Sequence, residues 1–106
     1  MANKYNEGNF NQEVLNSKEP VLVDFYAEWC GPCRMMGPVV EQLADRYEGR
    51  AKVGKVNVDE NQALAAAYGV MSIPSFLLFK GGQVVDSVTG GVSPQVLEQM
   101  VNEAVA

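Results

Sequence analysis

The stretch VLVDFYA, residues 21–27, limits the possible folds of this 106-residue chain more than any other segment. Its side chains are apolar on both alternating faces, and Asp24 is the exception. Successive side chains of a strand point to opposite faces of a sheet, so a strand of this kind is buried on both faces. The segment therefore predicts a central strand in a sheet that helices cover on both sides, which is an α/β arrangement.

Helical and extended patterns alternate along the rest of the chain. Phe10, Val14 and Leu15 recur at helical spacing, and Asn9 with Gln12 is typical of a capping box that opens a helix. The further expected elements are a helix over residues 34–48, a strand over 51–59, a short helix over 59–68, a hairpin over 75–90 and a helix over 93–105. This order predicts one domain over residues 1–106, in which a mixed sheet is sandwiched by helices.

Local signals mark the ends of these elements. Gly81-Gly82 predicts the hairpin turn, Gly69 predicts the end of the short helix, and Ser93-Pro94 predicts the start of the last helix. The apolar positions expected to be buried on the two long helices are Met35, Met36, Val39, Val40, Leu43, Ala44 and Tyr47, then Val96, Leu97, Met100, Val101, Ala104 and Val105.

The composition excludes several classes of function. There are 13 acidic and 8 basic residues, which gives a net charge of -5, and no block of Lys or Arg interrupts the sequence. Nucleic acids and anionic membranes are therefore not expected as partners. The opening MANKYNEGNF lacks the apolar core of a secretory signal, and the apolar runs are shorter than the ~20 residues that span a bilayer. We expect a cytoplasmic protein, in which a C-x-x-C motif is more often catalytic or metal-binding than structural.

Both cysteines lie in one tetrapeptide, CGPC at residues 30–33. A disulfide here closes a very short loop and adds little stability, which argues against a purely structural role. The chain has no histidine, and a structural zinc site usually needs four Cys or His ligands. A two-cysteine copper(I) carrier stays open because thiolates suit that ion. The motif favours redox chemistry with no metal.

The two cysteines are expected to differ because only the second lies in the first turn of the following helix. Unpaired N–H groups at a helix start stabilise a thiolate, and cysteines in such motifs have a lowered pKa. Cys30, nearer the loop, is expected to be the exposed nucleophile, and Cys33 the resolving thiol. Gly31 and Pro32 set a turn that keeps both sulfurs within bonding reach.

Asp24 is the one charged residue in its apolar strand. One interpretation is an edge or solvated position, because an ionised Asp is rarely fully buried. The other is a buried acid behind the cysteines, with a pKa raised by desolvation, that exchanges a proton with Cys33. Lys55, in the next strand, is either its charge partner or a surface lysine whose amine reaches water.

The run VDFYAEWCGPCR, residues 23–34, resembles the active-site strand and loop of the thioredoxin family. KVNVDEN, GVMSIPSFLLFKGG and TGG follow in the order and spacing of that family, so the resemblance extends over essentially the whole chain. It implies the thioredoxin fold, an α/β arrangement of a central five-stranded mixed β-sheet flanked by four α-helices, and general protein disulfide reductase activity. Tyr26, Arg34 and Ser75 stand where tryptophan, lysine and threonine are frequent in the family.

The resemblance also implies roles for individual residues. Cys30 matches the attacking thiol and Cys33 the resolving thiol of a redox disulfide, and Asp24 and Lys55 match the buried acid and the lysine near it. The Ile73-Pro74 bond matches a cis-proline peptide that faces the disulfide. The residues expected to contact substrate are Trp29, Gly31, Pro32, Ile73, Pro74 and Gly90.

The family further implies disulfide-containing proteins as substrates and re-reduction by thioredoxin reductase, a flavin enzyme that uses NADPH. A monomer without a bound cofactor is expected. Two alternatives stay open: an oxidant or disulfide isomerase on the same fold, and a binding module with no redox step. In the second case the apolar surface around Trp29, Ile73 and Val92 would hold a partner.

Overall fold

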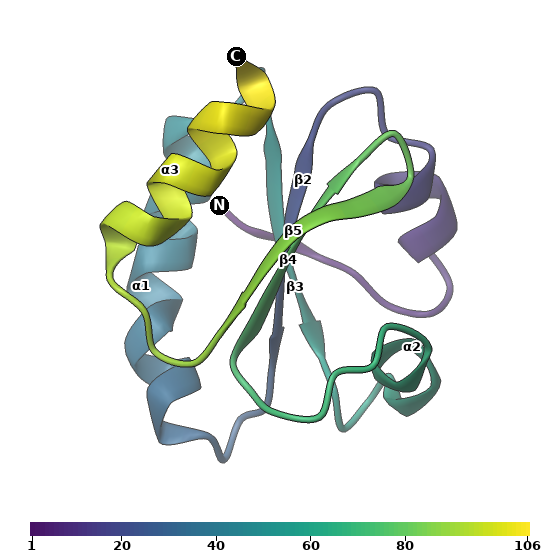
Figure 1. Cartoon of the computed structure of the whole chain (residues 1–106). Helices are drawn as coiled ribbons and strands as arrows, with labels where there is room; N and C mark the ends of the chain where they lie inside the picture. The colour runs from purple at the N-terminus through teal and green to yellow at the C-terminus, as the bar shows by residue number, and fades with distance from the viewer.

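The computed structural model describes all 106 residues, which form a five-stranded sheet with helices on both faces (Figure 1). In chain order the elements are β1 (Asn3–Lys4), the short π-helical turn η1 (Asn11–Leu15), β2 (Val21–Tyr26), α1 (Gly31–Arg46), β3 (Lys52–Asn57), α2 (Gln62–Ala67), β4 (Ser75–Lys80), β5 (Gln83–Thr89) and α3 (Pro94–Val105). The expected five strands and four helices are confirmed.

The strand order in the sheet is β1-β3-β2-β4-β5, which places β2 at the centre. β1, β3 and β2 run parallel, while β4 is antiparallel to β2 and β5 is antiparallel to β4. The hairpin between β4 and β5 turns at Gly81 and Gly82, whose φ angles of 63° and 80° lie in the left-handed region that glycine tolerates best. The predicted central strand and mixed sheet are therefore both present.

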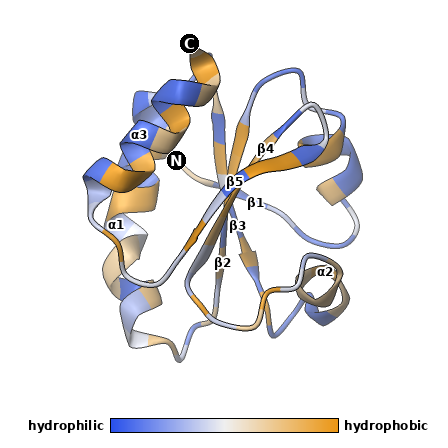
Figure 2. Cartoon of the chain, in the orientation of Figure 1, coloured by the Kyte–Doolittle hydropathy of each residue, from blue (hydrophilic) through white to orange (hydrophobic).

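Two hydrophobic cores fill the space between the sheet and its helices. α1 and α3 cover one face, and η1 and α2 lie on the other (Figure 1). Apolar and polar segments alternate along α3 (Figure 2). Alternation along β2 sends Leu22 into the core under α1 and α3, whereas Val23 and Phe25 enter the other core. Asp24 shares the face of Leu22, so the carboxyl group lies on the α1 side of the sheet.

The N-terminal turn is capped three residues earlier than the sequence suggested. The side-chain oxygen of Asn6 accepts the backbone N–H of Asn9 at 2.9 Å, and the side-chain oxygen of Asn9 accepts the N–H of Asn6 at 2.8 Å. This is a reciprocal capping pair, with Asn9 in the position that the sequence prediction assigned to Gln12. The prediction of Asn9 and Gln12 was wrong because an Asn stands at residue 6 as well as at residue 9. Asn6 and Asn9 have the same three-residue spacing as the predicted pair.

The long helices bury narrower stripes than predicted. α1 begins at Gly31 rather than residue 34, and Met35 in its first turns is 80% exposed because it points away from the sheet. On α3, Leu97, Met100, Val101 and Ala104 are buried, whereas Val96 is 38% exposed and Val105 is only partly buried. Ser93 stands at the N-cap, but its side chain makes no capping hydrogen bond.

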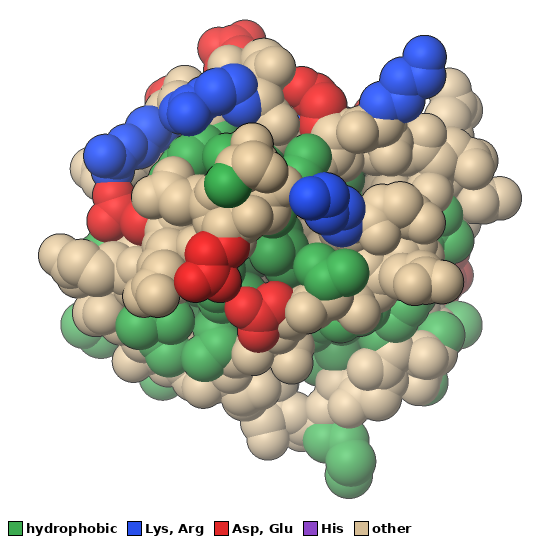
Figure 3. Space-filling view, turned by 45° about the horizontal axis from the view of Figure 1, so that its top comes forward, with side chains coloured by type: hydrophobic (Ala, Val, Ile, Leu, Met, Phe, Trp, Pro, Cys, Tyr) green, Lys and Arg blue, Asp and Glu red, His purple; other side chains and the backbone are tan.

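Charged side chains of both signs lie beside one another on the surface, with apolar side chains between them (Figure 3). One such pair joins the helices that share a core, since Arg46 of α1 forms an ion pair with Glu98 of α3. No helix has both the length and the apolar character needed to cross a membrane.

Candidate redox site

The two cysteines lie at the start of α1, immediately after the central strand. Cys30 is the N-cap residue of the helix, and its Sγ accepts the backbone N–H of Cys33 at 3.2 Å. The two residues form a disulfide, with 5.2 Å between their Cα atoms. Gly31 and Pro32 occupy the first helical turn, where a proline costs no hydrogen bond because its N–H would be unpaired anyway. A thiolate at Cys30 would thus accept the hydrogen bond from Cys33 N–H and be stabilised by the positive end of the helix dipole.

The expected difference in exposure between the two cysteines is not observed. Cys30 is 5% exposed and Cys33 is 4% exposed. Tyr26, Val58 and Ile73 pack against the pair, and Ile73 arrives from a loop distant in sequence that local patterns do not place. The two sulfurs differ instead in what they face. Cys30 Sγ lies 3.9 Å from the carbonyl oxygen of Ile73, whereas Cys33 lines the cavity that Asp24 also lines.

Three loops meet around Cys30. The Ile73-Pro74 peptide bond is cis, as the resemblance implied, and Pro74 is buried. The N–H of Gly90 donates to the carbonyl oxygen of Pro74 at 2.8 Å, and the φ of +99° at Gly90 favours glycine there. Next to it, a Cβ added at Gly91 would lie 3.9 Å from Cβ of Pro32. The Gly90–Gly91 segment therefore lies against both the Pro74 backbone and the cysteine loop.

Trp29 extends from this site with 69% of its surface exposed. Its indole Nε1 donates to Oδ2 of Asp59 at 2.8 Å, which fixes the ring beside the disulfide. Sequence reasoning assigned Asp59 only to a helix start and missed this contact. No local signal identifies it, because Trp29 and Asp59 lie 30 residues apart.

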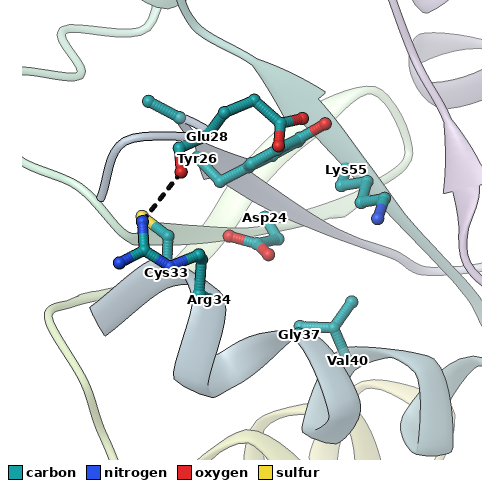
Figure 4. A pocket seen from close by; sticks show the side chains of 9 residues that line it. Asp24, Tyr26, Glu28, Cys33, Arg34, Gly37, Val40 and Lys55 are labelled. Atoms are coloured by element: carbon teal, nitrogen blue, oxygen red, sulfur yellow. Dashed lines mark hydrogen bonds between the residues drawn. The ribbon is translucent and has the colours of Figure 1, made fainter. Parts of the chain in front are cut away.

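Asp24 is buried near Cys33, and the two residues line a cavity of about 150 Å³ (Figure 4). The residue is 3% exposed, and its Oδ1 has no hydrogen-bond partner. Burial raises the pKa of Asp24 to about 7, and the positive charge of Lys55 opposes that rise. The interpretation of Asp24 as a buried acid is therefore confirmed, and the solvated alternative is wrong.

Lys55 is the neighbour of Asp24 in the register of β2 and β3, but its ion pair is with a different residue. Its Nζ lies 3.6 Å from Oε2 of Glu41, a residue of α1 that sequence reasoning did not single out. The amine also lies 5.4 Å from the centroid of the Tyr26 ring. Lys55 forms no direct ion pair with Asp24, but its charge lowers the pKa of Asp24, so it acts on the acid as a charge partner at longer range.

A family model described as thioredoxin matches residues 2–103. The chain belongs to the thioredoxin family. It is 53% identical to thioredoxin 1 of a Nostoc species over 102 residues, which are 96% of this chain and 95% of that protein. It is 51% identical over 105 residues to a thioredoxin of Chlorobaculum thiosulfatiphilum, covering 96% and 97% of the two chains. A thioredoxin of Haemophilus influenzae is 46% identical over 98 residues, 92% of each chain.

Family membership and geometry lead to the same activity. A thioredoxin-family chain with its C-x-x-C pair at disulfide distance is a protein-disulfide oxidoreductase. The pair Cys30–Cys33 carries out dithiol–disulfide exchange, and membership of the thioredoxin family implies disulfide-containing substrates and a reductase as partners. No three His, Cys, Asp or Glu side chains come together as a metal site would require.

Proposed function

We propose that this protein is a general disulfide reductase of the cytoplasm, in which Cys30 attacks the substrate and Cys33 resolves the intermediate. The observation that carries the proposal is the different surroundings of the two sulfurs. Cys30 Sγ lies at the helix N-cap beside the carbonyl of the partly exposed Ile73, whereas Cys33 lines the cavity of Asp24. The thiolate that the helix start stabilises is the one that faces the substrate.

The reaction takes two exchange steps. The Cys30 thiolate attacks one sulfur of the substrate disulfide, so that a Cys30–substrate disulfide forms and the other substrate sulfur leaves as a thiolate. Cys33 gives its proton to the Asp24 carboxylate and attacks Cys30 Sγ, which forms the Cys30–Cys33 disulfide and releases the second substrate thiolate. Two electrons pass from the dithiol to the substrate. An acid with a pKa of about 7 suits proton transfer from a thiol near neutral pH.

Docking of the substrate is proposed to use backbone rather than side-chain recognition. Ile73 is partly exposed next to Cys30, and its neighbour Pro74 is held by the hydrogen bond from Gly90. An extended substrate segment can pair with the backbone of Ile73 as an added strand does, while exposed Trp29 supplies apolar contact area. Gly31 and Pro32 leave the approach to Cys30 free of bulky side chains. Recognition of this kind selects few side chains and fits a broad range of substrates.

The roles of the two cysteines are tested by trapping. With a disulfide-containing protein as substrate, Cys33→Ser should accumulate a mixed disulfide on Cys30, and Cys30→Ser should neither reduce substrate nor trap it. Intact-mass spectrometry separates these outcomes. Equally efficient trapping on Cys33 in the Cys30→Ser variant would refute the assignment. The double Cys→Ser variant is the control for a binding module, since it should lose all activity if the function is redox.

Re-reduction is proposed to come from a flavin-containing, NADPH-dependent thioredoxin reductase, and the chain is proposed to act as a monomer. Equilibration with glutathione buffers distinguishes a reductant from an isomerase or oxidant. A reductant should have a potential below that of an isomerase, which lies near about -180 mV. A measured potential at or above that value would contradict the reductase proposal. NADPH consumption with such a reductase, compared with glutathione alone, identifies the electron source.

A further inference from the structure

The amine of Lys55 is held by a carboxylate other than that of its neighbour Asp24. Lys55 lies directly across from Asp24 on the adjacent strand, yet its Nζ pairs with Oε2 of Glu41 at 3.6 Å. Glu41 belongs to α1, the same helix that carries Cys33. Figure 4 shows the carboxyl group of Asp24 between Cys33 and Lys55, and all three residues line the same cavity. The Lys55 amine is thus within ion-pair distance of Glu41 and not of Asp24.

Glu41 is itself fixed in place. Its second oxygen, Oε1, accepts the backbone N–H of Ala2 at 2.7 Å. Ala2 directly precedes β1, and β1 pairs with β3 at Lys55. The carboxylate is therefore held from the N-terminal segment on one side and binds the Lys55 amine on the other. A side chain with both oxygens engaged is a defined anchor for the amine rather than a chance surface contact.

We propose that Glu41 is a positioning residue for the resolving step, because it holds the Lys55 amine away from Asp24 and leaves that carboxylate free to take the proton of Cys33. The inference rests on the proposed role of Asp24 as the base for Cys33. Glu41 touches neither sulfur nor substrate in this scheme. Its effect on the reaction passes through Lys55.

Electrostatics gives the direction of the effect. A cation within ~4–6 Å of a carboxylate lowers its pKa by about 1–3 units, and a carboxylate with a lower pKa is a weaker base. The burial of Asp24 raises its pKa, and Lys55 already lowers it from its present position. If Glu41 lost its charge, the flexible lysine would move toward the remaining unpartnered carboxylate. Asp24 would then become more acidic.

The other ionisable groups around the cavity are accounted for. Tyr26 faces Asp24 from β2, Glu28 from the loop that follows, and Cys33 and Arg34 from α1. The guanidinium of Arg34 is engaged, since its Nη1 donates to the carbonyl oxygen of Glu28 at 2.9 Å. Lys55 is thus the cation of this cavity that Glu41 holds by an ion pair.

A double-mutant cycle followed by NMR tests the proposal. The pKa of Asp24 is measured from its carboxyl ¹³C shift in the oxidised protein, for the wild type, Glu41→Gln, Lys55→Gln and the double variant. We expect Glu41→Gln to lower the pKa by about one unit in the wild-type background. In the Lys55→Gln background the same change should have less than about a third of that effect, because the amine is gone.

A matched control is Asp45→Asn, one helical turn further along α1, whose carboxylate pairs with the N-terminal amine instead. It removes the same charge and should leave the pKa of Asp24 unchanged. An equal fall of the pKa in both lysine backgrounds would mean that only the charge of Glu41 acts, and would overturn the proposal. So would the absence of any fall in Glu41→Gln.

The kinetic readout is the rate of mixed-disulfide resolution as a function of pH in single-turnover experiments. In Glu41→Gln the acid limb of this profile should shift to lower pH by the same amount as the NMR pKa. The rate of the first attack by Cys30 should not change. A lowered pKa with an unmoved profile would overturn the positioning role. Failure of the wild type to resolve mixed disulfides would refute the proposed function separately, because the titration requires no turnover.

Discussion

Replacing Asp24 by Asn should stabilise the protein in a strongly pH-dependent way. The carboxyl group is 3% exposed, and its Oδ1 lacks a hydrogen-bond partner, so ionising it in the folded state is unfavourable. Burial raises its pKa from 3.8 to about 7. An asparagine of the same shape has no charge to desolvate.

The size and sign of the effect follow from proton linkage. Below about pH 4 the acid is protonated in both the folded and the unfolded chain, so the wild type suffers no penalty. As the pH rises toward 7 the unfolded chain loses this proton while the folded chain retains it, and folding becomes less favourable. The shift of about three units, at ~1.4 kcal/mol each, gives a limit of about 4 kcal/mol. The advantage of Asp24→Asn should grow between about pH 4 and pH 7 and then level off.

Urea denaturation of the oxidised protein, followed by far-UV circular dichroism at intervals from pH 4 to pH 8, measures this curve. Glu60→Gln is the control, because it removes the negative charge of an exposed carboxylate. The variant Asp24→Asn should exceed the wild type by several kcal/mol at pH 8 and by much less at pH 4. A stability difference that stays the same across this range, or that shrinks as the pH rises, would refute the reasoning.

Two further predictions concern the frame around the site. Glu7→Gln should lower the free energy of unfolding by about 1 kcal/mol, because Oε2 of Glu7 accepts the N–H groups of Ala63 and Leu64 at the start of α2 at 3.1 and 3.4 Å. Urea denaturation measures this loss of stability, and an unchanged midpoint would contradict the capping role. Gly54→Ala should cost about 1–3 kcal/mol, because a Cβ there would lie 2.7 Å from Cζ of the buried Tyr5 ring. Calorimetry checks that loss, and a variant as stable as the wild type would show that the ring moves aside freely.

Most of the sheet could be predicted because its signals are local. The apolar pattern of β2 and the Gly81-Gly82 turn each occupy a few consecutive residues, and the structure contains both elements. β1 could not be predicted in this way, since it has two exposed residues and exists only through its pairing with β3. The five-strand count came from the family resemblance, not from the pattern of those residues.

The site shows the same division between local and long-range information. The position of Cys30 at the helix start follows from the strand that precedes it and the proline that comes next. Its burial by Ile73 and the contact of Trp29 with Asp59 depend on loops 43 and 30 residues away. The ion pair of Lys55 with Glu41 was missed because Asp24 is the neighbour of Lys55 in the sheet, whereas Glu41 approaches from helix α1.

The contrast between Asp24 and its surroundings gives the strongest physical argument for its role. Leu22, on the same face of β2, packs into the main core, and an apolar residue at position 24 would extend that core. The acid instead opposes folding by up to about 4 kcal/mol near neutral pH, a large part of the 5–15 kcal/mol that typically separates folded from unfolded domains. A direct ion pair with Lys55 would reduce this penalty, but Glu41 holds the amine elsewhere. The residue at position 24 therefore makes the protein less stable than an apolar residue there would, and Asp24 lines the same cavity as Cys33. A carboxylate that functions as a base near pH 7 has to be poorly solvated and poorly paired, so the destabilisation and the proposed proton transfer have the same cause.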